Sequence, residues 1–84
     1  MDALSDDDRR ILVFEREWWH LRTRKERAVR DGLGISVIRY YQRLNALLDR
    51  PAALAFDPML VGRLRRLREA RRRIRLSRRL AADL

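Results

Sequence analysis

The chain has 84 residues, which is enough for one small domain with a thin core and leaves no room for a deep cleft between subdomains. It contains no cysteine and one histidine, so we expect no disulfide, no thiolate nucleophile, no metal site, no cofactor and no enzyme activity. The formal net charge of +9 favours a polyanionic partner. Arginine accounts for 20 of the 21 basic residues, and this bias by itself carries little weight.

The spacing of apolar residues predicts helices throughout, because no segment shows the alternation of a β-strand. A first helix is expected after Ser5, with Asp8 completing a capping box. The apolar face of this helix would place Trp18 at the centre of the core. A second helix is expected from a capping box at Thr23 to about Asp31.

A third helix is predicted over residues 37–48, and the glycine-containing turn before it gives the pair the organisation of a helix-turn-helix. Gly34 lies where the backbone of such a turn needs a positive φ, and Ser36 is the expected N-cap of the third helix. Arg30 and Arg43 depart from the usual pattern, which has small or apolar residues at these positions. An αα-corner of an ordinary helical bundle uses the same turn chemistry and is the structural alternative.

A long C-terminal helix is predicted to begin at the Asp-Pro pair of residues 57–58 and to reach about Leu80. Arg71 interrupts the apolar stripe of this helix. We therefore expect an all-α fold of three to four helices. Residues 1–70 would form a helix-turn-helix domain, and residues 71–84 would form an arginine-rich helical extension.

Basic charge is concentrated in the later part of the chain. The net charge is −2 over residues 1–22, +4 over residues 23–50 and +8 over residues 58–84. The start of the chain lacks the pattern of a signal peptide, and no apolar run reaches the roughly 18 residues of a transmembrane helix. We expect a cytoplasmic, nucleoid-associated protein that meets a polyanion with one side; a solvated arginine-rich tail is the simpler alternative.

The outward face of the third predicted helix carries side chains suited to reading base pairs. Arginine pairs with guanine, asparagine and glutamine pair with adenine, and an apolar side chain contacts the thymine methyl group. The candidate base-reading residues are Ser36, Ile38, Arg39, Gln42 and Asn45. Basic residues elsewhere would neutralise phosphates, and the candidates are Arg24, Lys25, Arg43, Arg65, Arg68, Arg72, Arg75 and Arg79.

Several motifs of the chain occur together in a known family. They are FEREWW at residues 14–19, GIS at 34–36, RYYQRLNALLDRP at 39–51, DPMLV at 57–61 and RLRRLR at 63–68. With these motifs the chain resembles, over residues 9–72, a family of small basic actinobacterial proteins of unknown function that are predicted to contain a helix-turn-helix. The resemblance implies a bacterial cytosolic protein and supplies no activity. Members often have proline after the serine that starts the recognition helix, where this chain has Val37.

The sequence favours a small transcriptional regulator or nucleoid protein that binds double-stranded DNA, with no membrane and no small-molecule ligand. One alternative is a module that docks on RNA polymerase or another transcription component. Its partner surface would combine the apolar stripe of the C-terminal helix with the aromatic first helix. A weaker alternative is RNA or ribosome binding through the arginine-rich helix. Since a monomer of this size reads about one half-site, a homodimer partner is also considered.

Overall fold

The computed structural model describes residues 3–83 of the protein, and this range contains five α-helices, one 3₁₀-helix and no strand. The all-α prediction is confirmed. The short helical turn that the sequence favours from Pro51 onward is a separate helix over residues 51–56, so there are five α-helices in place of three to four. The helices in chain order are α1 (Asp6–Glu17), η1 (Trp18–Leu21), α2 (Lys25–Leu33), α3 (Val37–Leu48), α4 (Pro51–Phe56) and α5 (Pro58–Ala82).

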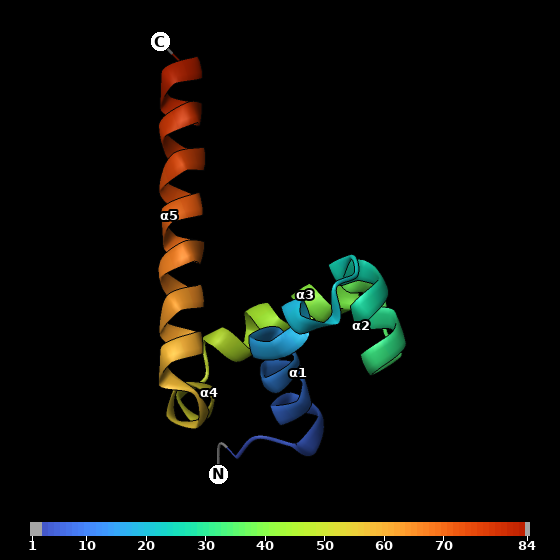
Figure 1. The fold of residues 1–84 in the computed structure, drawn as a ribbon. Coiled ribbons are helices and arrows are strands. Elements are labelled where there is room, and N and C mark those ends of the chain that lie inside the picture. Colours follow the sequence, from blue (N-terminus) through green and yellow to red (C-terminus); the bar gives the residue numbers. More distant parts are fainter. Residues whose placement is uncertain (1–2, 84) are drawn as a thin grey trace.

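The helices are arranged as a compact group from which one long helix projects. Figure 1 shows α1, α2 and α3 grouped beside the lower part of α5, with the short α4 at its base. The C-terminal half of α5 extends away from the other helices, and residues 69–83 are all exposed. The helix is continuous across residue 70, and the division into a domain and an extension at this point stays a prediction.

The core lies where α3 meets the other four α-helices, and α3 supplies more buried residues than any of them. Tyr40 is the largest fully buried side chain, and the edge of the Phe14 ring packs against it with the ring centres 5.6 Å apart. The buried cluster consists of Ile11, Leu12, Val29, Tyr40, Leu44, Leu47, Leu48, Ala53, Leu60 and Val61.

Three helix starts follow the capping signals in the sequence. The Ser5 hydroxyl accepts a hydrogen bond from the backbone N–H of Asp8 (3.0 Å), whose carboxylate accepts one from the Ser5 N–H (3.1 Å). The Ser36 hydroxyl likewise accepts from the Arg39 N–H, and the Asp57 carboxylate accepts from the Leu60 N–H. These bonds satisfy backbone donors that have no partner within the helix, and they fix where α1, α3 and α5 begin.

Two predictions about the first half of the chain are wrong. The α-helical period ends at Glu17, where the tighter η1 begins, so Trp18 is half-buried instead of central and Leu21 is exposed. The buried residues of α1 are Ile11 and Leu12 instead. The predicted capping box at Thr23 does not form, because α2 begins one residue later with Arg24 as an N-cap that makes no side-chain cap bond.

Gly34 ends α2 in the left-handed region, with φ of 70°, as the sequence predicts. Because this conformation costs other residues about 1–2 kcal/mol, we expect Gly34→Ala to lower the free energy of unfolding by that amount. Gly62→Ala is the matched control: it lies inside α5, and a Cβ there would lie 3.4 Å from the flexible end of Arg66. This second change should raise the free energy of unfolding by about 0.5–1 kcal/mol. Urea denaturation measures the free energy of unfolding of both variants. Equal changes in the two would contradict the left-handed conformation of Gly34.

Candidate nucleic-acid interface

The outward face of α3 is exposed and carries no acidic residue along the whole helix. The opposite face is held in the core by four buried residues of the same helix. Ile38 is 70% exposed, and Arg39 and Gln42 are also exposed. Within residues 3–83 the side chains of Arg39 and Gln42 make no hydrogen bond or ion pair. These three side chains are therefore available to a partner without a change in the fold.

Two other predicted base-reading residues have roles inside the protein. Ser36 caps α3 through its hydroxyl, at 3.2 Å from the Arg39 nitrogen. The Asn45 side-chain oxygen accepts a hydrogen bond from Arg68 at 3.0 Å, which leaves the amide nitrogen of Asn45 as a donor. All five predicted residues therefore lie at the start or on the outer face of α3. Three of them have no side-chain partner among the described residues, whereas Ser36 and Asn45 make hydrogen bonds within the protein.

Arg65 and Arg68, predicted to bind phosphates, contact the C-terminal end of α3. The Arg65 Nε donates to the backbone carbonyl of Leu48. The Arg68 guanidinium donates to the Asp49 carboxylate at 2.6 Å, and this hydrogen bond lowers the pKa of that carboxyl below its usual value. Cations are favoured at a helix C-terminus, where backbone carbonyls lack partners, so the two arginines fasten α5 to α3.

Arg43, also predicted to bind phosphates, lies near the start of α1. Its guanidinium is 3.8 Å from the Asp8 carboxylate, which also receives a hydrogen bond from Arg50 at 2.9 Å. Burial raises the pKa of the Asp8 carboxyl, but the contacts with Ser5 and Arg50 outweigh it and hold the pKa below its usual value. This cluster ties the first turn of α1 to the later part of α3.

Lys25, the only lysine of the chain, is enclosed by α1, η1 and α3. Its ammonium lies 2.6 and 2.7 Å from the two carboxylate oxygens of Glu15, and their side chains are only 19% and 9% exposed. The ammonium also lies over three aromatic rings, 5.2 Å from the ring centre of Trp18, 5.4 Å from that of Tyr40 and 4.8 Å from that of Tyr41. Lys25 is thus unavailable to a phosphate unless this pair breaks.

Tyr40 completes the same network from inside the core. Its hydroxyl donates to a Glu15 carboxylate oxygen at 2.6 Å. Burial, together with the hydrogen bond to Glu15, raises the pKa of the Tyr40 hydroxyl far above its usual value, so this group remains a proton donor. Sequence analysis missed the Lys25 network, and its one signal was a single lysine among 20 arginines.

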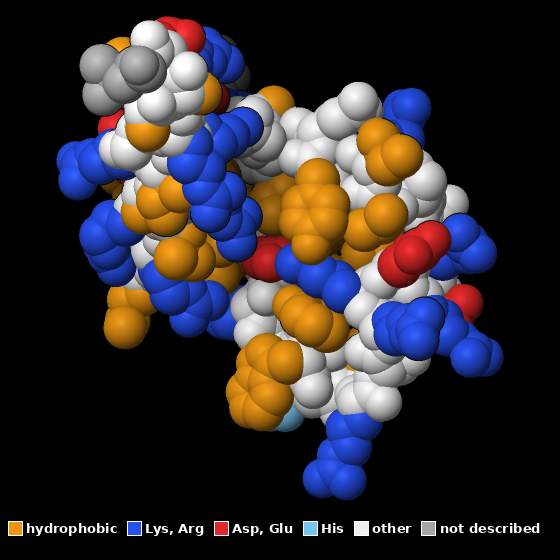
Figure 2. Space-filling model, turned by 90° about the horizontal axis from the view of Figure 1, so that it is seen from above, with side chains coloured by type: hydrophobic (Ala, Val, Ile, Leu, Met, Phe, Trp, Pro, Cys, Tyr) orange, Lys and Arg blue, Asp and Glu red, His pale blue; other side chains and the backbone are white. Residues whose placement is uncertain are grey.

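The remaining predicted phosphate-binding residues are exposed. Arg24, Arg75 and Arg79 have no ion pair among the described residues, and Arg72 has one weak contact, 3.7 Å from Glu69. Arg75 and Arg79 are one turn apart on α5 and share a face. Figure 2, which looks down on the molecule from the tip of α5, shows blue side chains spread along this helix. The exposed basic charge of α5 is therefore free to meet phosphates.

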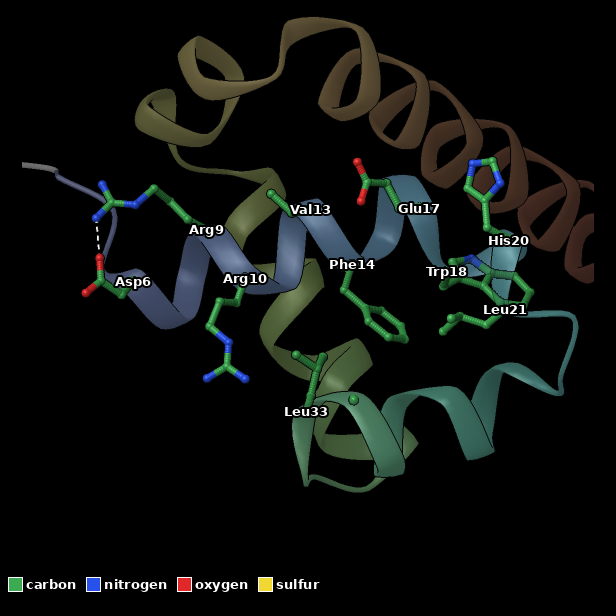
Figure 3. Close-up of a pocket in the computed structure, with 11 residues that line it drawn as sticks. Asp6, Arg9, Arg10, Val13, Phe14, Glu17, Trp18, His20, Leu21 and Leu33 are labelled. Atoms are coloured by element: carbon green, nitrogen blue, oxygen red, sulfur yellow. Dashed lines mark hydrogen bonds and ion pairs between the residues drawn. The ribbon is translucent and has the colours of Figure 1, made fainter.

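A hollow of about 650 Å³ lies between α1, η1 and the end of α2. In the close-up of Figure 3, Phe14, Trp18 and Leu21 lie along it, and Asp6 at its rim pairs with Arg9. His20 stacks on Trp19 with 3.7 Å between the ring centres.

No group of three or more histidine, cysteine or acidic residues within residues 3–83 is placed to hold a metal ion. No helix in that range is long and apolar enough to span a membrane.

Comparison with known proteins identifies a family and no activity. Residues 3–76 match the family described as "Protein of unknown function (DUF3263)". No curated protein and no solved structure matches the chain. The matched range contains α1 to α4 and most of α5, so it includes the exposed face of α3 and the first arginines of the projecting helix.

Proposed function

We propose that this chain, which belongs to the DUF3263 family, is a DNA-binding protein of the transcriptional-regulator or nucleoid type that places α3 in the major groove. The observation that carries this proposal is the exposed, acid-free face of α3 with Ile38, Arg39 and Gln42 unengaged. A helix whose outer face only contacts solvent has no need of this combination of apolar, arginine and glutamine side chains. These side-chain types are the ones that contact base-pair edges in the major groove.

The geometry of α2 and α3 supports this use. The left-handed Gly34 and the Ser36 cap define the turn between the two helices, as a helix-turn-helix requires. The 12 residues of α3 span about 18 Å, and a helix fits the major groove, which is about 12 Å wide. Arg39 would pair with guanine, Gln42 with adenine, and Ile38 would contact a thymine methyl group. Asn45 would use its remaining amide donor.

Phosphate contacts would come from the exposed arginines. Each neutralised phosphate releases condensed counterions, so binding should weaken steeply as salt increases. The other predicted cations have internal contacts that hold α3 beside α1, α2 and α5, and we therefore propose a supporting role for them. The proposed phosphate-binding set is therefore Arg24, Arg72, Arg75 and Arg79, and the proposed supporting set is Lys25, Arg43, Arg65 and Arg68.

The test is the sequence preference of two α3 variants. We expect Arg39→Ala and Gln42→Ala each to reduce the preference for a selected duplex over a shuffled one by about 1–3 kcal/mol. Both side chains are exposed, so thermal unfolding should stay unchanged. The duplex is first selected from a random library with the parent protein, and binding is then measured by fluorescence anisotropy.

The matched control for these variants is Arg27→Ala, which removes an exposed arginine of α2. It lowers the net charge by the same amount as Arg39→Ala, whereas Gln42→Ala leaves the charge unchanged, and Arg27 lies outside the proposed reading face. It should weaken binding to both duplexes equally, or not at all. If Arg39→Ala and Gln42→Ala bind every duplex as the parent does, α3 is not the reading helix.

A further inference from the structure

A groove of about 640 Å³ separates α5 from η1 and the aromatic part of α3. One wall comes from α5 and has two aliphatic residues, Leu64 and Leu67, among four arginines at positions 63, 68, 71 and 75. The other wall comes from η1, with Trp18 and Trp19, and Tyr41 of α3 also lines the groove. Figure 2 shows orange side chains on this face, around an adjacent red and blue pair and next to α5.

Three apolar or aromatic residues that line the groove are largely exposed to solvent. Trp19 is 63% exposed, Tyr41 is 47% exposed and Leu67 is 45% exposed. Leu64 and Trp18 beneath them are half-buried. Exposed apolar groups that are contiguous and surrounded by polar residues mark interaction surfaces, because covering them removes apolar area from water.

The charge of the groove selects the partner. Its lining has six basic residues and one carboxylate, that of Glu15, which Lys25 neutralises. Arg63, Arg71 and Arg75 are exposed and have no ion pair among residues 3–83. A partner must therefore present acidic groups beside an apolar surface.

The two leucines in the α5 wall favour a protein over a nucleic acid. Bases stack on aromatic rings and phosphates pair with arginine, but Leu64 and Leu67 offer neither contact. They offer a surface for apolar side chains instead. From Arg63 to Arg75, α5 contains 13 residues and rises about 18 Å, which equals slightly more than three turns of a helix.

We infer that this groove binds an acidic amphipathic helix of a partner protein. The apolar face of that helix would pack between Leu67 and Trp19, and its carboxylates would pair with Arg63 and Arg71. Ile38, Arg39 and Gln42 do not line the groove, whereas Asn45 and Arg75 line it and also belong to the proposed DNA-binding set. The two surfaces are therefore tested on the full-length chain through residues that belong to only one of them, Leu67 for the groove and Arg39 for the outer face of α3.

The two tryptophans of the chain both line the groove, so their fluorescence reports its occupancy. The probe is a synthetic 15-residue helical peptide without tryptophan or tyrosine, with leucine on one face and glutamate on the other. Its counterpart has lysine in place of every glutamate. We expect the glutamate peptide to shift tryptophan emission to the blue in a saturable manner and the lysine peptide to leave it unchanged.

Two variants of α5 localise the binding. Leu67→Glu should weaken binding of the glutamate peptide at least tenfold, because it places a carboxylate in the α5 wall. Ile74→Glu is the matched control: Ile74 is 52% exposed on the same helix but does not line the groove. It should change the affinity less than threefold. Both positions are exposed, and a cooperative thermal melt verifies that each variant folds.

Four outcomes would overturn the inference. These are absence of a blue shift with the glutamate peptide, and equal binding by the parent and the Leu67→Glu variant. A third is that single-stranded DNA displaces the peptide and binds the Leu67→Glu variant as tightly as it binds the parent protein. This result would assign the groove to nucleic acid. The fourth is a concentration-dependent blue shift of the protein alone, with dimers in sedimentation, which would assign it to a second copy.

Discussion

Lys25→Ala is expected to lower the free energy of unfolding by about 3 kcal/mol, although Lys25 is one of 21 basic residues. The change leaves the Glu15 carboxylate, only 9% exposed, without its cation. It also removes the group over which the rings of Trp18 and Tyr41 gather. Removing one partner of a buried ion pair costs more than the pair contributes, because the remaining charge is poorly solvated. Urea denaturation monitored by circular dichroism measures the loss.

The control for this prediction is another cation of the same helix. Arg27 lies 3.6 Å from Asp31, but both side chains are more than two-thirds exposed, so Arg27→Ala should cost less than about 1 kcal/mol. The double variant Lys25→Met with Glu15→Gln should recover much of the stability, because no unpaired charge remains. A Lys25→Ala protein as stable as the parent would show that the enclosed pair does not hold these helices together.

Truncation after Ala70 is expected to flatten the salt dependence of DNA binding while the thermal melt changes little. The buried core residues of α5 end at Val61, and residues 69–83 are exposed, so the fold loses little packing. Three proposed phosphate contacts, Arg72, Arg75 and Arg79, are removed. At roughly 0.9 in log–log slope for each contact, the slope should fall by about 2.7. Anisotropy titrations at four salt concentrations measure it.

A full-length variant with glutamine in place of Arg72, Arg75 and Arg79 separates the effect of charge on the salt dependence from the effect of helix length. It should reproduce the flattened slope if the arginines act on phosphates. Unfolding of the truncated protein, or conversion of a dimer into a monomer, would instead show that the end of α5 has a structural partner. The apolar residues Ile74, Leu76 and Leu80, all at least half exposed, would then be its contact surface.

The starts of helices were predictable because their signals are local. A side chain at the N-cap bonds a backbone N–H three residues ahead, so Ser5, Ser36 and Asp57 are sufficient to locate α1, α3 and α5. The positive φ of Gly34 was predictable for the same reason. The end of α1 was not, because the change to η1 at Trp18 has no capping signal in the sequence.

The candidate interface was predictable only in part. Periodicity indicates which face of α3 is apolar, and therefore which face is exposed. It does not indicate which arginines have partners, because those partners lie far along the chain: Arg65 bonds a carbonyl 17 residues away and Arg50 a carboxylate 42 residues away. In the sequence, Arg65 and Arg68 resemble the free arginines that follow them. The fold distinguishes them by placing the end of α3 beside the start of α5.

The enclosure of Lys25 also determines how the charge of this protein responds to modification. Guanidinium groups keep their proton throughout the physiological range and are not substrates for lysine acylation. The one lysine amine is paired with Glu15 and lies over three aromatic rings, and its side chain is only 19% exposed. Acetylation of lysine, which adjusts the attraction of many basic proteins to polyanions, therefore has a single target in this chain, and that target is held in an ion pair. The electrostatic attraction of this surface to a polyanion is set by salt and by its acidic neighbours.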